Sequence, residues 1–240
     1  MMNLIVSNAR DDRPVEAADA EPVASVYEQI RRDILKGSFA ADERLKISNL
    51  AARYHSGTNP VREALQQLRG EGFVVFEPNR GARVRRIDES YVRDIFEMEV
   101  LIEPYLTGWF VSHCTDDDIE RLEAIQSEIE ALDFGDRHRH ATLDTDFHRL
   151  MYDRHYNRHA VNLWWKHREI LIAIGALNPM ALSRRRAVLE EHRALIAALK
   201  NQDERAAVDV ISRHVKGAGE HLVSSLAARL RTRAVPLPDP

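Results

Sequence analysis

Hydrophobic positions in the first third of the chain predict three short helices. Apolar side chains recur there three or four residues apart, which places them on one face of a helix. This spacing covers three segments, residues 23–36, 47–54 and 59–70. Gly70 and Gly72 then end the third helix, because glycine favours helix termini over helix interiors.

A change of period after these glycines predicts two strands. Residues 73–76 are an apolar run of β-branched and aromatic side chains, and residues 82–86 alternate small or apolar with basic side chains. Between them, Glu77–Gly81 contains the proline, asparagine and glycine of a turn. Three helices followed by a two-stranded wing are typical of proteins that read DNA with the third helix, where Arg62 occupies an early turn.

The remainder of the chain predicts helices alone. Apolar residues recur at helical spacing over residues 89–113, 116–133, 137–156, 159–176, 181–200 and 203–231. Thr115 and the three aspartates that follow it form a helix start, Phe134–Asp136 forms a turn, and Asn157 ends one helix before the next. Short connections between amphipathic helices favour an antiparallel bundle. The expected fold is therefore mainly α, a winged helix-turn-helix joined to a helical bundle.

Charge separates these two parts. The chain has a net charge of -4, which by itself argues against nucleic-acid binding. Residues 22–87, however, hold 12 Lys+Arg against 7 Asp+Glu, whereas the remainder holds 22 against 31. A basic module attached to an acidic one fits a DNA reader joined to a domain with another task.

The first part of the chain also resembles a known family. The segment from Tyr27 to Arg86 is similar to the winged helix-turn-helix of GntR-family transcription regulators, and the matching positions are Ile34–Gly37, Arg44–Leu45, Leu50–Ala51, Pro60–Leu65, Leu68, Glu71–Gly72 and Pro78–Gly81. The family usually has arginine where this chain has Thr58, so fewer charged DNA contacts are expected. The pattern and the resemblance together give eight candidate DNA contacts: Ser48, Thr58, Asn59, Arg62, Gln66, Arg80, Gly81 and Arg83.

Three histidines in the helical part lie on faces that the apolar pattern predicts to be buried. They are His148, His192 and His214, and Asp144 precedes His148 by one helical turn on the same face. Each histidine taken singly is more often a hydrogen-bonded core residue than a ligand. Four such groups inside one bundle each need a partner, and one divalent ion would supply it for all of them. This ligand set suits Zn, Ni, Co, Fe or Mn.

A second resemblance favours a metal site over three separate core histidines. Residues 89–229 are similar to the helical FCD-type effector domain of the FadR subgroup, through Asp144–His148, Asn157, Glu191–His192, Asp203, Ala207 and His214. The resemblance implies that Asp144, His148, His192 and His214 hold one divalent metal ion per chain. It also implies a homodimer, a pseudo-palindromic operator and a small effector that bears a carboxylate. Four segments follow: a disordered leader (1–21), the DNA-binding domain (22–87), an all-helical effector-binding, metal-binding and dimerisation domain (88–231) and a flexible tail (232–240).

Glu99 and His221 are the candidate residues of the effector pocket. Where the subgroup commonly has an arginine suited to an effector carboxylate, this chain has Glu99. One hypothesis is that Glu99 faces the pocket and disfavours dicarboxylates, and the alternative is that it pairs with an arginine of a neighbouring helix. Other polar residues are expected on solvated faces: His138, His140, His155, His159, His167 and Arg184–Arg186. Trp164 and Trp165 are expected to pack in the bundle or between subunits.

The sequence favours a regulator over an enzyme. No glycine-rich phosphate loop and no Gly-x-Ser-x-Gly elbow is present, although a histidine-rich metal site could in principle activate water. The alternatives to a repressor controlled by a metabolite are therefore a metal-dependent enzyme and a sensor of the metal itself. One cysteine and the lack of an apolar run near ~20 residues predict a cytoplasmic protein without a membrane span.

Overall fold

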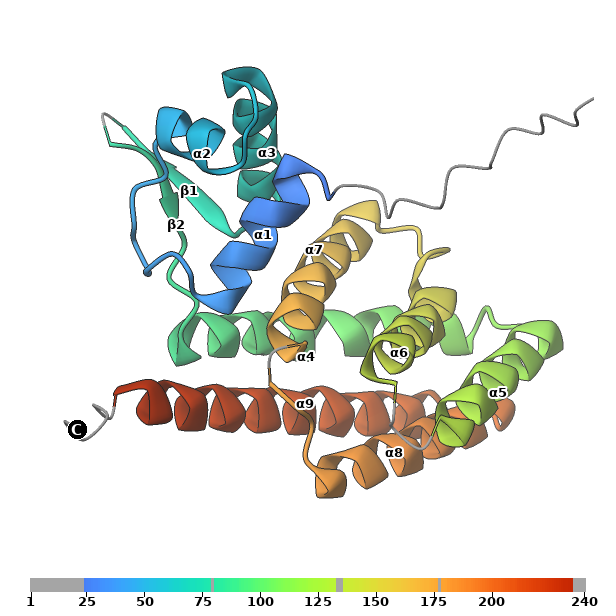
Figure 1. Ribbon diagram of the computed structural model, residues 1–240. Helices are drawn as coiled ribbons and strands as arrows, with labels where there is room; N and C mark the ends of the chain where they lie inside the picture. Colours follow the sequence, from blue (N-terminus) through green and yellow to red (C-terminus); the bar gives the residue numbers. More distant parts are fainter. Residues whose placement is uncertain (1–23, 79, 133–135, 177, 235–240) are drawn as a thin grey trace, which may run out of the picture.

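A computed structural model describes residues 24–78, 80–132, 136–176 and 178–234 (Figure 1). The expectations for the leader at 1–21, for Asn79 in the wing turn, for the turn residues Phe134 and Gly135 and for the tail beyond Ala234 lie outside the described residues.

The N-terminal part folds as the predicted winged helix-turn-helix. Its elements are α1 (Val26–Lys36), α2 (Ile47–Arg53), α3 (Thr58–Gly70), β1 (Val74–Glu77) and β2 (Gly81–Val84). The two strands pair antiparallel with Val74 opposite Val84 and Glu77 opposite Gly81. Gly81 has a φ of 75°, a conformation that glycine adopts without strain, at the start of β2. We call this unit, residues 26–84, the reading head.

The C-terminal part is helical throughout its described residues, as predicted. Its helices are α4 (Glu89–Val111), α5 (Asp116–Ala131), α6 (Arg137–Tyr152), α7 (Arg158–Gly175), α8 (Leu182–Lys200) and α9 (Glu204–Ala234). The long helices α4 and α9 lie side by side, with α7 and α6 across α4 and with α8 against α9 (Figure 1). We call residues 89–234 the effector domain.

Helix starts in the effector domain follow the caps that the sequence contains. The Thr115 hydroxyl accepts from the backbone N–H of Asp118, and the Asp118 carboxylate accepts from the backbone N–H of Thr115. Asn157 caps α7 in the same way, through its side-chain oxygen and the N–H of Ala160. Each bond satisfies a backbone donor that the first helical turn leaves unpaired.

Two hydrophobic clusters hold the molecule together. The first fills the reading head around Ile30, Leu65 and Phe73, and it continues into the effector domain through α4, α7 and α9, with members such as Ile174 and Leu226. The second lies wholly within the effector domain and contains Trp164, which confirms the predicted bundle packing of that residue. Because the first cluster crosses from one unit to the other, the reading head is packed directly onto three effector-domain helices.

No helix within the described residues is both long enough and apolar enough to cross a membrane.

Candidate metal centre and DNA-reading surface

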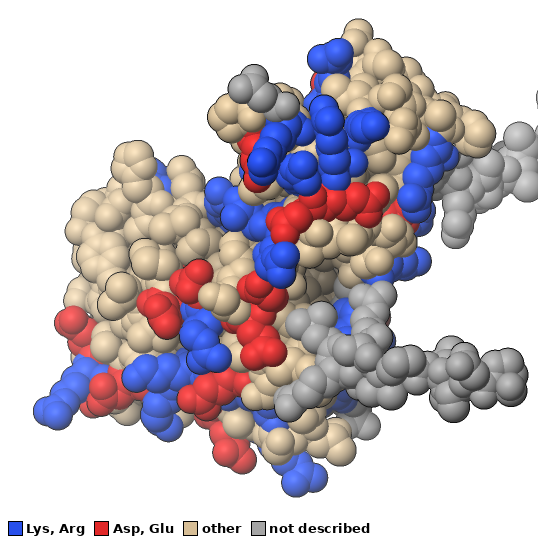
Figure 2. Space-filling view, turned by 90° about the vertical axis from the view of Figure 1, so that its left-hand side faces the viewer, with Lys and Arg blue, Asp and Glu red and all other residues tan. Residues whose placement is uncertain are grey.

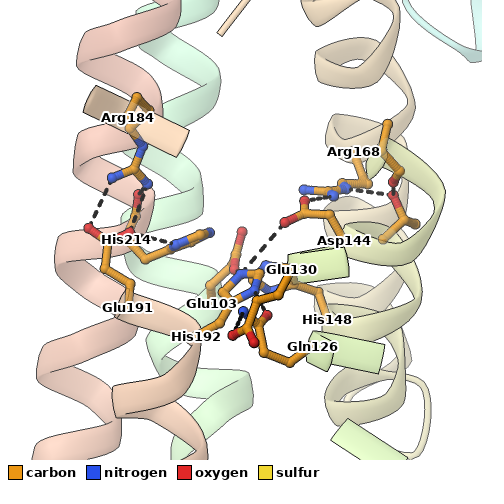
Figure 3. Close-up of polar contacts among 12 residues, drawn as sticks. Glu103, Gln126, Glu130, Asp144, His148, Arg168, Arg184, Glu191, His192 and His214 are labelled. Carbon is orange, nitrogen blue, oxygen red and sulfur yellow. Dashed lines mark hydrogen bonds and ion pairs between the residues drawn. The ribbon is translucent and has the colours of Figure 1, made fainter. Parts of the chain in front are cut away.

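Three histidines from three helices converge inside the effector domain. His148 comes from α6, His192 from α8 and His214 from α9, and all three are buried. One ring nitrogen of each lies within 4.8 Å of those of the other two (Figure 3). We call these residues the histidine triad. The sequence analysis predicted this grouping although His148 and His214 are 66 positions apart in the chain, and the fold brings all three histidines together.

Second partners fix the orientation of two of these rings. The Nδ1 atom of His214 lies 2.9 Å from Oε2 of Glu191, and Nδ1 of His192 lies 2.9 Å from Oε1 of Gln126 (Figure 3). A carboxylate and an amide oxygen accept hydrogen bonds, so each Nδ1 carries the proton. The opposite nitrogen, Nε2, is then the one with a free lone pair.

Other ring nitrogens of the triad have no hydrogen-bond partner. Among the described residues, both ring nitrogens of His148 and Nε2 of His192 are buried without a hydrogen bond. Burial lowers the pKa of His192 to about 3 and holds the pKa of His148 well below its usual value, so both rings are neutral near pH 7. Neutral imidazoles with unshared lone pairs are what a divalent ion requires, and the residues present therefore fit a metal.

Asp144 lies beside the triad and is shared with an arginine. One of its oxygens, Oδ2, accepts a hydrogen bond from Arg168 of α7, and the other, Oδ1, is 3.6 Å from Nε2 of His192. Burial alone would raise the pKa of Asp144, but Arg168 and the three neighbouring histidines together outweigh it and hold the pKa well below the usual value. Asp144 is thus an anion next to the triad, with one oxygen turned toward it.

Helix α4 contributes two buried carboxyl groups, and one of them, that of Glu103, lies beside the triad. Oε2 of Glu103 lies 3.5 Å from Nδ1 of His148 and accepts a hydrogen bond of 3.0 Å from the hydroxyl of Tyr152. Glu99, one turn earlier, is 2 % exposed, and its Oε1 lies 2.5 Å from Nδ1 of His167. Burial raises the pKa of each carboxyl group to about 8. Glu103 was not among the predicted site residues, because a single glutamate on an apolar helix face does not form a recognisable pattern.

Glu99 and His221 occupy different surroundings. The neighbouring helix α7 provides a partner for Glu99, as the second hypothesis supposed, but this partner is His167 and not an arginine. Nε2 of His221 accepts a hydrogen bond of 3.4 Å from the backbone N–H of Ala181, at the start of α8.

Three of the residues expected on solvated faces are exposed and others are not. His138, His159 and Arg186 are exposed, whereas His155 is buried among aromatic rings and His167 bonds to Glu99. Arg184 is also buried, so the prediction of a wholly solvated Arg184–Arg186 face is wrong. The cause is tertiary, because α9 covers one side of α8 and offers Arg184 partners that the local sequence does not reveal.

All eight candidate DNA contacts lie on the reading head. Seven are exposed, on α2 (Ser48), on α3 (Thr58, Asn59, Arg62, Gln66) and at the wing (Arg80, Gly81). Arg83 is half-buried and donates a hydrogen bond of 2.6 Å to the backbone oxygen of Asp42. Figure 2 shows Lys and Arg gathered on the upper lobe, which is the reading head, above a body where both signs of charge mix.

Comparison with known proteins agrees with both units. Residues 22–84 match the family described as bacterial regulatory proteins, gntR family, and residues 94–217, over half of the chain, match the FCD domain. The chain belongs to the GntR family. This GntR-family regulator has the FadR-type arrangement, in which a DNA-binding winged helix-turn-helix precedes an FCD domain.

Similar proteins are also transcription regulators. The HTH-type transcriptional regulator YdhC of Bacillus subtilis is 25% identical over 198 residues, 82% of this GntR-family chain and 88% of YdhC. The HTH-type transcriptional repressor GlaR of Escherichia coli is 32% identical over 114 residues, 46% of this chain and 52% of GlaR. The structure of E. coli McbR/YncC superposes with a TM-score of 0.58 at 18% identity, over 88% of this chain and 97% of that one. At that identity the likeness concerns the fold.

Proposed function

We propose that this protein is a transcriptional repressor whose affinity for DNA is controlled by a small carboxylate-bearing metabolite bound beside a divalent metal ion. The observation that carries the proposal is the histidine triad, buried in a domain whose helices also form the base of a DNA-reading head.

Four residues would hold the metal: Asp144, His148, His192 and His214. The inward lone pairs of the triad and the free oxygen of Asp144 form a nitrogen-rich set with one oxygen, which suits Zn, Ni, Co, Fe or Mn. A bound ion supplies positive charge to which a carboxylate of the metabolite binds. The positive charge of Arg168 helps to keep Asp144 ionised, and the hydrogen bond between them occupies one of the two carboxylate oxygens.

The carboxyl groups on α4 restrict which metabolite fits. Glu99 and Glu103 lie within a turn of each other, and neither supplies the positive charge that the second carboxylate of a dicarboxylate would need. An effector with a single carboxylate on the metal and a hydroxyl or amine toward α4 suits this arrangement, because those groups donate hydrogen bonds to carboxyl oxygens.

A homodimer follows from the way in which such a head reads DNA. One winged head covers one half-site, and a two-fold dimer reads two half-sites of a pseudo-palindrome. Helix α4 offers a surface for the second copy, because Met98, Leu101 and Tyr105 form an exposed stripe at helical spacing. Tyr156 extends it through a hydroxyl contact of 2.7 Å with Tyr105. An apolar stripe of this kind is uncommon on a monomer.

The link between the effector site and the head runs through two helices. Helix α7 carries Arg168 at the site and Ile174 in the cluster of the head, and α9 carries His214 at the site and Leu226 in that cluster. A metabolite that shifts α7 or α9 against α4 would therefore move the head. The metabolite can act in this way only if it binds the shifted and the unshifted arrangement of these helices with different affinity.

The test begins with an operator selected from a random DNA library by the metal-loaded protein. Binding to that operator is then measured with a panel of small mono- and dicarboxylates, for the metal-loaded and the metal-stripped protein. We expect at least one acid to change the affinity about 5-fold or more, within the usual range of coupling energies, and only when metal is present.

Three outcomes would contradict the proposal. Failure to select any preferred sequence would remove the DNA-reading role. Consumption of an acid by the metal-loaded protein would favour a metal-dependent enzyme. A change in DNA affinity on adding metal alone, with no further effect of any acid, would make the ion itself the signal.

A further inference from the structure

The buried guanidinium of Arg184 connects the start of α8 to the middle of α9. Its Nη2 donates a hydrogen bond of 2.8 Å to the backbone oxygen of His214, and its Nη1 donates one of 2.9 Å to Oε1 of Glu191. A buried arginine is costly unless its donors are paired, and here both Nη atoms are paired with residues that lead to the same ligand, whereas Nε has no hydrogen bond (Figure 3).

Glu191 carries this connection to the imidazole. Oε1 accepts a hydrogen bond from Nη1 of Arg184. Oε2 lies 2.9 Å from Nη2 of Arg184 and also accepts the Nδ1 proton of His214 at 2.9 Å. Held by Arg184, the carboxylate keeps His214 in the form that carries its proton on Nδ1 and presents Nε2 toward the other two histidines.

A glycine on α9 leaves room for the guanidinium. A Cβ atom placed on Gly217 would lie 2.6 Å from Nη1 of Arg184, a distance that forces a shift. Glycine within a helix costs about 0.5–1 kcal/mol relative to alanine, so local propensity does not explain this residue. The space that it leaves does.

We propose that Arg184 is a positioning residue for the metal ligand His214, acting through Glu191 in a space that Gly217 keeps open. The inference rests on the proposed metal site but concerns residues that do not touch the ion. Carboxylates that orient ligating histidines typically change metal affinity 10- to 100-fold when they are disturbed.

The other anchored ligand provides a comparison within the same molecule. His192 bonds to the neutral amide of Gln126, which donates to Glu130, and Glu130 pairs with Arg193 at 2.7 Å. Arg193 and Glu130 are exposed. Although Arg193 follows His192 in the sequence, its side chain is connected to the His192 ring only through Glu130 and Gln126. Exposed ion pairs contribute little, so Arg193 should affect the metal far less than Arg184 does.

The experiment measures the affinity of the metal-stripped full-length protein for Zn²⁺ by chelator competition. Arg184→Met and Gly217→Ala are compared with the wild type and with the double variant. We expect each single variant to bind Zn²⁺ about 10-fold more weakly or worse. The double variant should be no weaker than Arg184→Met alone, since the alanine then has nothing to displace.

Controls separate positioning from general damage. Gly175→Ala adds the same methyl group to a helical glycine with nothing within 4 Å, and Arg193→Met removes the more distant arginine. Both should keep the wild-type affinity. The visible absorption of the Co²⁺-loaded protein, which reports the ligand set, should change in Gly217→Ala and not in Gly175→Ala.

The outcomes distinguish this inference from the metal proposal. If the wild type binds no divalent ion, the metal site itself is wrong. If the wild type binds Zn²⁺ and Gly217→Ala binds it equally well with an unchanged Co²⁺ spectrum, then Arg184 does not position His214. Should Arg184→Met fail to fold, Gly217→Ala, which removes no polar group, still decides the question.

Discussion

At the scale of single residues, the hydrogen-bond partner of one ring nitrogen decides whether the other nitrogen of a histidine is available as a metal ligand. Gln126 and Glu191 occupy one nitrogen of His192 and of His214, so the other nitrogen of each ring is turned inward. His148 has Glu103 at 3.5 Å, which is longer than a typical hydrogen bond, and both of its ring nitrogens lack a hydrogen-bond partner among the described residues. The ring of His148 is therefore oriented by packing and not by a second hydrogen-bond partner.

Arg62 gives a residue-scale prediction for DNA binding. It is exposed on α3, the helix that enters the major groove in this fold. Arg62→Ala should weaken binding to the selected operator by about 1–3 kcal/mol and relax the preference at one base position. Fluorescence anisotropy with a series of operator variants measures both effects.

The matched control is Arg213→Ala, which removes the same charge from an exposed position on α9. Equal losses in the two variants would show that Arg62 contributes only net charge. An unchanged affinity for Arg62→Ala at every salt concentration would exclude it from the contact.

At the scale of elements, α4 divides its surface between two tasks. Its inward side carries Glu103, beside His148 of the triad, and the buried Glu99 one turn earlier, and its outward side carries the exposed stripe that includes Leu101. This division explains why the helix lacks the simple apolar and polar faces of a surface helix. Buried acids and exposed apolar residues depart from the pattern that folding alone favours, and such departures are expected at functional sites.

The capping box of α5 gives an element-scale prediction with a defined pH dependence. Asp118 is buried, which alone would raise its pKa, but hydrogen bonds from Thr115 and Arg154 lower the pKa below 3.8. A carboxylate with a lowered folded-state pKa stabilises the protein above its unfolded value and loses that effect as the pH falls. Asp118→Asn should therefore lower the free energy of unfolding by about 1 kcal/mol at pH 7.

The difference between the two proteins should begin to shrink below a pH of about 4, where Asp118 becomes protonated in the unfolded chain, and continue to shrink until the pH passes the lower pKa of the folded state. Urea unfolding followed by circular dichroism at pH 7 and at pH 3 measures it. A difference of the same size at both values would mean that the charge of Asp118 has no part in the cap.

Elements were more predictable from the sequence than the surroundings of the site. Caps such as Thr115 and Asn157 act over three residues, so their pattern is visible in the chain. The triad could be proposed because each histidine interrupts an apolar stripe. The buried positions of Arg184 and His155 depend on contacts with other helices, and no local pattern distinguishes them from solvated residues.

At the scale of the whole molecule, a basic reading head is packed against an acidic effector domain through a shared hydrophobic cluster. The same domain is proposed to carry the surface that pairs two copies. Leu101, which is 67 % exposed, lies in the middle of the α4 stripe. Leu101→Asp should convert a dimer into monomers and weaken operator binding at least 10-fold, because one head then binds without the other.

Leu182→Asp is the matched control for that variant. Leu182 is similarly exposed, at 71 %, but it lies at the start of α8, away from the α4 stripe. Analytical ultracentrifugation should find Leu182→Asp dimeric. A Leu101→Asp protein that remains a dimer would move the interface elsewhere.

The most direct measurement is a calorimetric titration of metal-stripped protein with Zn²⁺, repeated with Ni²⁺, Co²⁺ and Mn²⁺. The structure predicts one ion per chain for the wild type, since the inward nitrogen atoms of the triad meet within 4.8 Å. A free metal concentration of 100 times the dissociation constant should add about 2.7 kcal/mol to the free energy of unfolding. His192→Ala combined with His214→Ala should abolish both effects. Absence of binding by the folded wild type, or undiminished binding by the double variant, would contradict the metal centre on which this account depends.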